Sequence, residues 1–124
     1  LRVVNDQFGA PTWSRLVAEA SALILARWLA RPALEADSGT YHLTCAGRAS
    51  WHEFAAAILA DLERREGRRP ALEAIPGAGY PTAAARPANS QLDCTRLEQR
   101  FGVRLPDWRA ALELCLESGA TTWG

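Results

Sequence analysis

The stretch that decides the fold spans residues 50–67 and reads SWHEFAAAILADLERREG. Its first four residues match a capping box, in which the Ser50 hydroxyl accepts from the amide of Glu53 and the Glu53 carboxylate accepts from the amide of Ser50. These bonds satisfy donors that are otherwise unpaired at a helix start. Apolar residues then recur at helical spacing up to Gly67. We predict a helix over residues 51–66 with one buried face, formed by Trp51, Phe54, Ala55, Ile58, Leu59 and Leu62.

Outside this helix, the chain alternates strand-like and helical segments, which favours an α/β fold that is rich in helices with a few short strands. The pattern predicts strands within residues 2–8, 40–44 and 72–75, and helices over residues 12–30, 93–102 and from 105 onward. Thr12 or Ser14 can cap the first helix, and Pro106 suits the first turn of the last. The first helix is apolar nearly all round, so we expect it to lie between two layers. The strands are too few for these helices, which indicates an incomplete domain.

The composition is that of a globular protein, with 48% hydrophobic and 23% charged residues. The 14 basic and 14 acidic residues give a formal net charge of zero. The net charge therefore gives no electrostatic reason to expect binding to nucleic acid or to an anionic membrane surface. The most apolar stretch, residues 21–30, is too short to span a membrane and contains Arg27. We expect a cytoplasmic, soluble protein with no nucleic-acid partner and no membrane partner.

All 14 basic residues are arginines, and the chain contains neither lysine nor methionine. An arginine guanidinium stays protonated near neutral pH, so no mechanism that needs a lysine amine can operate within this chain. Because Leu1 is not a natural start, we expect a piece of a longer protein. Cys45, Cys94 and Cys115 form no CxxC pair, which favours reduced, partly buried thiols over a zinc or redox site.

The usual catalytic motifs are missing from the sequence. It has no Gly-x-Ser-x-Gly elbow, and residues 77–79 lack the context of a glycine-rich phosphate loop. We interpret His42, which lies in a predicted strand, as structural, and His52 as an exposed residue of a helix start. We therefore predict neither catalytic, cofactor-binding nor metal-binding residues in this chain.

Residues 6–12, DQFGAPT, join a predicted strand to a helix. Ligand sites of α/β proteins concentrate at the carboxyl ends of strands. The amide of Gln7 can bind a base or a sugar hydroxyl, and Gly9 lets a ligand approach the backbone closely. The alternative is that this segment is only a turn and a helix start.

Residues 86–93, RPANSQLD, follow a stretch rich in Gly, Ala and Pro. Arg86 can bind a diphosphate through two parallel hydrogen bonds. Asn89 and Ser90 can bind sugar hydroxyls or stabilise a local turn. The alternative is a solvated arginine beside an Asx turn, with Asp93 capping the next helix.

These two segments, in this order, are similar to the C-terminal part of the dTDP-4-dehydrorhamnose reductase family, which belongs to the extended short-chain dehydrogenase/reductases. The resemblance covers nearly the whole chain and includes residues 39–43, 50–55, 80–82, 101–102 and 105–108. It implies that residues 1–124 are a C-terminal substrate-binding domain. An N-terminal NAD(P)-binding Rossmann domain would then be the absent partner.

The resemblance implies that the full-length enzyme uses NADPH or NADH to reduce dTDP-4-dehydro-L-rhamnose to dTDP-L-rhamnose for cell-surface polysaccharide. The family's glycine-rich loop and Tyr-x-x-x-Lys pair do not occur in this chain, so we expect it to be inactive by itself and to bind dTDP weakly. The implied substrate-binding residues are Asp6, Gln7 and Gly9 on one wall, and Arg86, Asn89 and Ser90 on the diphosphate or sugar side. Gln91 stands where relatives often carry a basic residue, which removes a second charge contact.

Some members of the family dimerise through acidic C-terminal residues and Mg²⁺, and Glu113 and Glu117 are the counterparts here. We also expect exposed apolar faces to favour self-association, including a homodimer. Two alternatives remain open: a non-catalytic regulatory module of the same superfamily, and a fragment of another nucleotide-sugar epimerase or dehydratase. The Arg-Pro-x-Asn-Ser loop and the tryptophan of the last helix favour the reductase branch.

Overall fold

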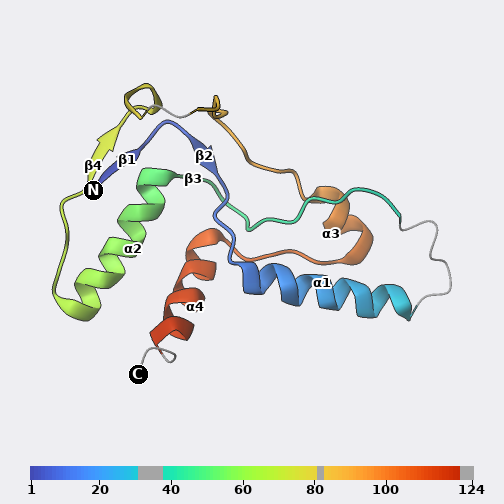
Figure 1. Cartoon of the computed structure of the whole chain (residues 1–124). Coiled ribbons are helices and arrows are strands. Elements are labelled where there is room, and N and C mark those ends of the chain that lie inside the picture. The colour runs from blue at the N-terminus through green and yellow to red at the C-terminus, as the bar shows by residue number, and fades with distance from the viewer. Residues whose placement is uncertain (31–37, 81–82, 121–124) are drawn as a thin grey trace. The chain divides into compact units, whose positions relative to one another are not determined.

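The computed structural model describes residues 1–30, 38–80 and 83–120 (Figure 1). The chain divides into two compact units. Unit 1 comprises Leu1–Pro11 and Arg48–Gln91, and unit 2 comprises Thr12–Gly47 and Leu92–Gly124. Each unit therefore combines two segments that lie far apart in the sequence.

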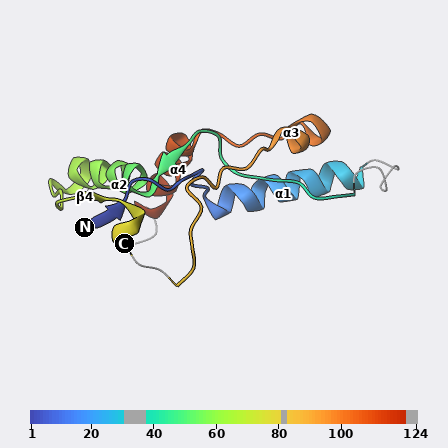
Figure 2. The same cartoon turned by 90° about the horizontal axis from the view of Figure 1, so that it is seen from above.

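Unit 1 contains two small sheets and one long helix. Strand β1 (Arg2–Val4) runs parallel to β4 (Glu73–Ile75), with Val4 opposite Ile75. Strand β2 (Phe8–Gly9) pairs antiparallel with β3 (Ala49–Ser50). Helix α2 (Trp51–Glu66) contacts both β1 and β3, and β1 and β4 lie side by side in Figures 1 and 2. The buried apolar residues of this unit are Val4, Ala49, Leu59 and Ile75.

The predicted capping box of α2 is confirmed. The amide of Glu53 donates to the Ser50 hydroxyl at 3.1 Å, and the amide of Ser50 donates to the Glu53 carboxylate at 2.6 Å. The helix ends at Gly67, which has a left-handed φ of 66° and donates to the carbonyl of Glu63 at 2.8 Å. Of the predicted buried face, Leu59 is buried and Phe54, Ala55, Ile58 and Leu62 are half-buried. The prediction is wrong for Trp51, which is 60% exposed. It occupies the first helical position, where the chain has just left β3.

We expect the Ser50→Ala substitution to lower the free energy of unfolding by about 1 kcal/mol, because it removes the acceptor for an orphaned helix amide. Urea unfolding followed by circular dichroism measures this loss. Ser21→Ala is the matched control, since the exposed Ser21 hydroxyl only donates back to the carbonyl of Val17 within α1. Alanine is the better helix former there, so no loss is expected. Equal losses for both variants would contradict the capping role.

Unit 2 contains helices α1 (Ser14–Leu29), α3 (Thr95–Phe101) and α4 (Trp108–Ala120). As predicted, Gly102 ends α3 with a left-handed φ of 62°. Pro106 lies two residues before α4 rather than in its first turn, because its carbonyl accepts from the amide of Ala46 at 2.9 Å. The core of this unit comprises Ala20, Cys45, Leu97, Val103, Leu105, Trp108 and Ala111.

The predicted cap of α1 is wrong. Trp13 occupies the cap position without a side-chain hydrogen bond. The hydroxyl of Thr12 instead accepts from the amide of Cys45 at 3.0 Å. The Thr12 hydroxyl, which the local pattern assigned to the helix cap, therefore bonds to a residue 33 positions further along the chain.

The predicted strand at residues 40–44 does not form. The amide of Thr44 donates to the thiol of Cys94 at 3.3 Å, where a sheet would place a carbonyl. His42 is exposed and lies outside any strand, so the strand on which its structural interpretation rested is missing. The sequence also predicts a polar connection over residues 35–39, most of which lies outside the described residues.

Among the described residues, helix α1 is not covered on both sides, which differs from the prediction that it lies between two layers. Its buried residue is Ala20, whereas Leu23, Leu25 and Leu29 are 44%, 51% and 66% exposed. Their exposure agrees with the expectation of an incomplete domain. In the parts of the chain that the structure describes, no helix is long and apolar enough to cross a membrane.

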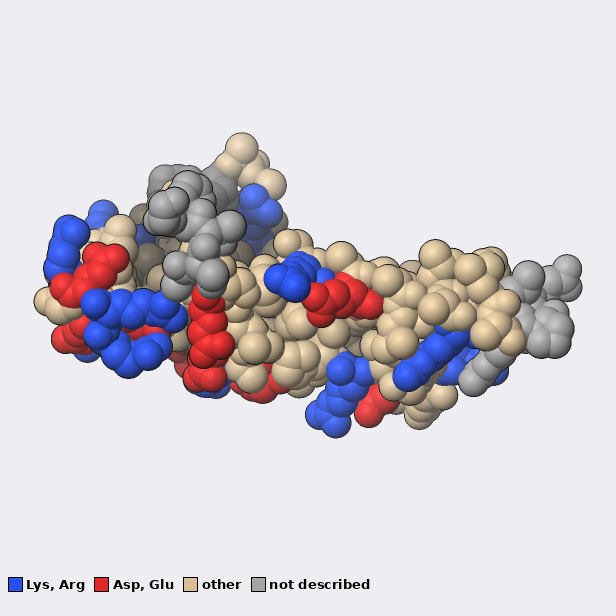
Figure 3. Space-filling view, turned by 90° about the horizontal axis from the view of Figure 1, so that it is seen from below, with Lys and Arg blue, Asp and Glu red and all other residues tan. Residues whose placement is uncertain are grey.

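Several charged side chains of α2 pair within the helix or with a residue just beyond its end. Asp61 bonds to Arg64 and to Arg65, the latter at 2.7 Å, and Glu63 bonds to Arg69 at 3.1 Å. Figure 3 shows arginine and acidic side chains next to each other on the face that it presents.

Candidate functional site

Most of the two segments selected from the sequence, residues 6–11 and 86–91, belongs to unit 1, where the segments lie side by side. The amide of Phe8 donates to the carbonyl of Ala88 at 2.9 Å, and the amide of Ser90 donates to the carbonyl of Phe8 at 2.8 Å. Phe8 and Asn89 thereby form a parallel bridge. The structure thus brings together two loops that are separated by almost 80 residues in the sequence.

The first cavity beside this pairing holds about 400 Å³, which suits a small-molecule site. Three predicted residues, Asp6, Gln7 and Arg86, line it together. Arg86 is exposed, so its guanidinium can bind an anion that enters the cavity. The remaining walls come from Gly77, Ala78, Tyr80, Ala84, Ala85 and Ala88.

Asp6 holds the wall of the first cavity in place. Both of its carboxylate oxygens accept from the amide of Gly77, at 2.8 and 3.0 Å. A Cβ added to Gly77 would lie 2.8 Å from the side-chain nitrogen of Gln7 and 3.0 Å from Asp6. The absence of a side chain at Gly77 therefore lets the turn at Gly77–Gly79 approach both residues.

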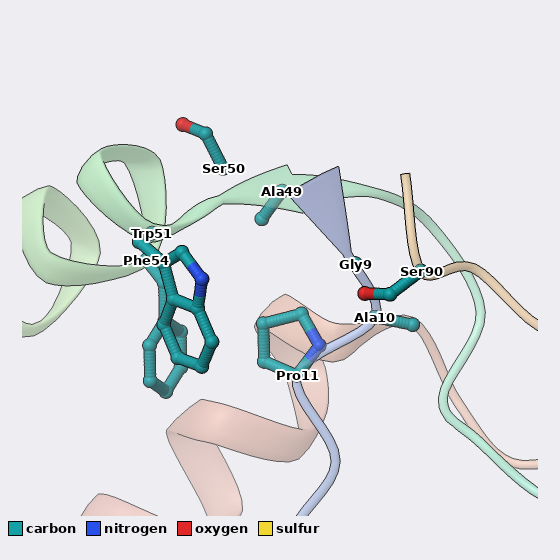
Figure 4. Close-up of a pocket in the computed structure, with 8 residues that line it drawn as sticks. All are labelled: Gly9, Ala10, Pro11, Ala49, Ser50, Trp51, Phe54 and Ser90. Carbon is teal, nitrogen blue, oxygen red and sulfur yellow. The ribbon is translucent and has the colours of Figure 1, made fainter. Parts of the chain in front are cut away.

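A second cavity of about 130 Å³ lies beside the same pairing (Figure 4). It contains two other predicted residues, Gly9 and Ser90. A Cβ at Gly9 would lie 2.8 Å from the Ser90 hydroxyl, so glycine permits the close approach of these segments. The Ser90 hydroxyl donates to the carbonyl of Phe8 at 3.0 Å. The other lining residues are Ala10, Pro11, Ala49, Ser50, Trp51 and Phe54.

Asn89 lines neither of these two cavities. Its side-chain oxygen accepts from the amide of Gln91 at 3.1 Å, as in the alternative that assigned it to an Asx turn. In unit 2, Asp93 accepts from the amide of Thr95 at 2.8 Å. Hydrogen bonds from the side chain and the amide of Thr95 lower the pKa of Asp93 below its ordinary value.

Sequence reasoning missed the aromatic wall of the second cavity. Trp51 and Phe54 were assigned to the core because they match the helical apolar stripe. The signal that could have separated Trp51 from the stripe is its position directly after the capping residue, in the first turn. Arg48 was also missed, and its guanidinium carbon lies 3.8 Å from the centre of the Phe8 ring.

Among the described residues, the thiols and carboxylates form no cluster that could hold a metal ion. Burial raises the pKa of the Cys45 thiol, which keeps that thiol protonated. Within the described ranges, no group of three or more His, Cys, Asp or Glu residues could hold a metal ion, and Glu113 and Glu117 are both exposed on α4. Gly77–Gly79 is a 3₁₀ turn after β4 rather than a loop into a helix, so this glycine turn does not fit a dinucleotide phosphate.

Fold and site together define a ligand-binding domain of the α/β class. Residues 1–121 match the model of the RmlD substrate binding domain. The chain belongs to this family. The α/β fold class and the resemblance read from the sequence are thus confirmed.

The similar proteins are reductases. Over 121 residues the chain is 46% identical to a dTDP-4-dehydrorhamnose reductase of Burkholderia thailandensis, covering 94% of this chain and 41% of that protein. The structure of a reductase ortholog from Clostridium acetobutylicum matches with a TM-score of 0.78 and 28% identity, over 97% of this chain and 39% of that one. The reductase of Bacillus anthracis, solved in complex with NADP, matches with a TM-score of 0.76 and 26% identity, over 91% and 36%. The chain spans about two fifths of the length of the relatives it matches.

Proposed function

We propose that residues 1–124 form the C-terminal substrate-binding domain of a dTDP-4-dehydrorhamnose reductase and bind its dTDP-sugar. NADPH or NADH would bind a Rossmann domain elsewhere in the protein and supply the hydride. The observation that carries the proposal is the pairing of residues 6–9 with residues 86–90, which places Gln7 and Arg86 in one cavity. The chain itself contributes binding and orientation, so it has no activity alone.

In this proposal Arg86 binds the diphosphate. Its guanidinium offers parallel donors that match phosphate oxygens, and it reaches solvent on the rim of the cavity. The amide of Gln7 bonds a hydroxyl of the ligand. Asp6 acts by holding the turn at Gly77, because its carboxylate would repel a phosphate at close range.

The Rossmann domain is the proposed partner of unit 2. A cavity of about 610 Å³ runs along α1, lined by Ile24, Trp28, Tyr41 and Phe101 among others. This apolar surface, together with the exposed leucines of α1, is what a missing layer of an α/β domain would cover. A cytoplasmic location and a homodimer also belong to the proposal. The proposal includes no Mg²⁺ site.

The test is the affinity for dTDP, followed by NMR titration of the ¹⁵N-labelled chain because weak binding is expected. Arg86→Ala should weaken binding roughly 10- to 100-fold, since a hydrogen bond to a charged group contributes about 1.5–3 kcal/mol. Arg69→Ala is the matched control: it removes the same charge from an exposed arginine of the same unit, one that pairs with Glu63. An equal loss in both variants, or no binding by the unaltered chain, would contradict the proposal.

A further inference from the structure

Arg48 packs its guanidinium on the ring of Phe8 in unit 1. The guanidinium carbon lies 3.8 Å from the centre of that ring, within the range of a cation–π contact. Arg48 is exposed and Phe8 is half-buried, so the arginine covers part of the outer surface of the ring. Neither residue lines either of the two cavities beside the paired segments. A role for this contact in the site must therefore act through the structure around Phe8.

Phe8 is the residue that joins the two segments of the candidate site. Its amide donates to the carbonyl of Ala88 at 2.9 Å. Its carbonyl accepts from the amide of Ser90 at 2.8 Å and from the Ser90 hydroxyl at 3.0 Å. Gln7, directly before Phe8, lines the first cavity, and Gly9, directly after it, lines the second. A displacement of Phe8 would therefore move the walls of both cavities.

The stacked guanidinium lies on the face of β2 that points away from Gly9. Successive side chains of a strand alternate between its two faces, so Phe8 and Gly9 point in opposite directions. Phe8 is the register partner of Ser50, and Arg48 precedes Ser50 by two residues, which places these three side chains on one face. Figure 4 shows the Ser50 side chain pointing away from Pro11, which lines the second cavity. The guanidinium is thus placed to support the pairing rather than to contact a ligand in this cavity.

The pairing of Phe8 with residues 86–91 lies at the surface of unit 1. All six residues of that range are exposed, so the pairing buries little apolar surface. The strands β2 and β3 contain only two residues each. Segments with exposed backbone hydrogen bonds and few buried contacts open at a low cost in free energy. A contact that stabilises Phe8 therefore changes how often the two segments are paired.

We propose that Arg48 is a positioning residue for the candidate site. Its stacked guanidinium holds Phe8 in place and so keeps residues 6–9 paired with residues 86–90. One cation–π contact at an exposed site corresponds to a roughly two- to fivefold change in the ratio of paired to open forms. A ligand that binds only the paired form loses affinity in proportion to the population of that form. This inference rests on the proposed function and adds the residue that presents both cavity walls to the ligand.

Hydrogen exchange of the ¹⁵N-labelled whole chain measures the pairing directly. Arg48→Gln should speed exchange of the Phe8 and Ser90 amides roughly two- to fivefold, because both amides donate across the pairing. The amide of Asn5 is the internal reference, since it donates to the carbonyl of Ile75 at 3.0 Å beside the β1–β4 pair. Its exchange rate should not change.

Three further variants separate the stacked cation from a simple loss of charge. Arg48→Lys keeps a cation that can lie over the ring, so its exchange rates should stay within about twofold of those of the unaltered chain. Arg69→Gln is the matched control, because it removes the same charge from another exposed arginine of unit 1, and it should change neither the Phe8 nor the Ser90 amide. In a Phe8→Leu background, Arg48→Gln should have no further effect, since the ring on which the guanidinium stacks is gone.

The affinity for dTDP, followed by NMR titration, measures the consequence for the site. Arg48→Gln should weaken binding by the same factor of roughly two to five, and Arg48→Lys should largely restore it. Arg69→Gln should bind dTDP as the unaltered chain does. A loss of affinity in Arg48→Gln without faster amide exchange would overturn the positioning role, because Arg48 would then contact the ligand itself. Faster exchange with unchanged affinity would overturn it too, since the stacked guanidinium would then be a structural contact only.

The exchange rates also separate this inference from the proposed function. Unchanged exchange at Phe8 and Ser90 in Arg48→Gln, or an equal acceleration at Asn5, would overturn the positioning role while leaving the substrate-binding domain intact. If the unaltered chain does not bind dTDP at any concentration, the proposed function fails. The exchange rates of the Phe8 and Ser90 amides still decide in that case whether Arg48 holds the pairing.

Discussion

Replacing Trp108 with alanine should unfold the unit to which it belongs. Trp108 is 1% exposed and is the largest fully buried side chain among the described residues. Truncation of a buried tryptophan to alanine costs about 3–5 kcal/mol, because the transfer free energy is lost and a cavity remains. Unit 2 has few other large buried side chains, so its remaining core cannot absorb that loss. We expect the thermal transition to move below room temperature or to lose its cooperativity.

Circular dichroism and differential scanning calorimetry measure this effect. Leu114→Ala is the matched control, because Leu114 lies on the same helix α4 and is 47% exposed. That substitution should change the free energy of unfolding by about 0.5 kcal/mol or less. Trp108→Phe should give an intermediate loss. A melting temperature of Trp108→Ala close to that of Leu114→Ala would show that Trp108 is not the centre of this core.

The elements that the sequence predicted correctly are those whose signals are local. The capping box at Ser50 and Glu53 fixes the start of α2 within four residues, and Gly67 fixes its end. The elements predicted wrongly depend on distant partners. The hydroxyl of Thr12 bonds to Cys45, and the amide of Thr44 bonds to Cys94, so neither the cap of α1 nor a strand at residues 40–44 forms. No local pattern contains those partners.

In the candidate site too, local features predicted some residues, and only the tertiary structure identifies the others. Gln7 and Arg86 were predicted because their side chains suit phosphates and hydroxyls and because they lie in loops. That the two loops bond through Phe8 could not be predicted, since a parallel pairing of distant segments leaves no local signature. Trp51 was missed for the opposite reason: its apolar type matched the helical stripe, and only tertiary structure shows that the helix exposes it.

Replacing Gly47 with alanine should destabilise unit 2 nearly as much as the loss of Trp108. Gly47 has a φ of +84°, where an L-residue is strained by about 1–2 kcal/mol. An added Cβ would also collide with the carboxylate of Asp107 and lie 2.9 Å from the Trp108 ring. Asp107 cannot easily turn away, because its other carboxylate oxygen accepts from the amide of Arg109 at 2.9 Å. Crowding of this kind adds about 1–3 kcal/mol.

Gly67 provides the control that separates strain from crowding. It has a similar left-handed φ of +66°, but an added Cβ there would meet nothing within 4 Å. Gly67→Ala should therefore cost about 1 kcal/mol, from backbone strain alone. The excess loss in Gly47→Ala, measured by urea unfolding, then reports the crowding against Asp107 and Trp108. Equal losses of unfolding free energy in the two variants would mean that the side chains of Asp107 and Trp108 move aside without a cost in free energy. A clear excess would mean that the bonds from Ala46 to Pro106 and Trp108, at 2.9 and 3.0 Å, hold α4 too firmly for its start to move.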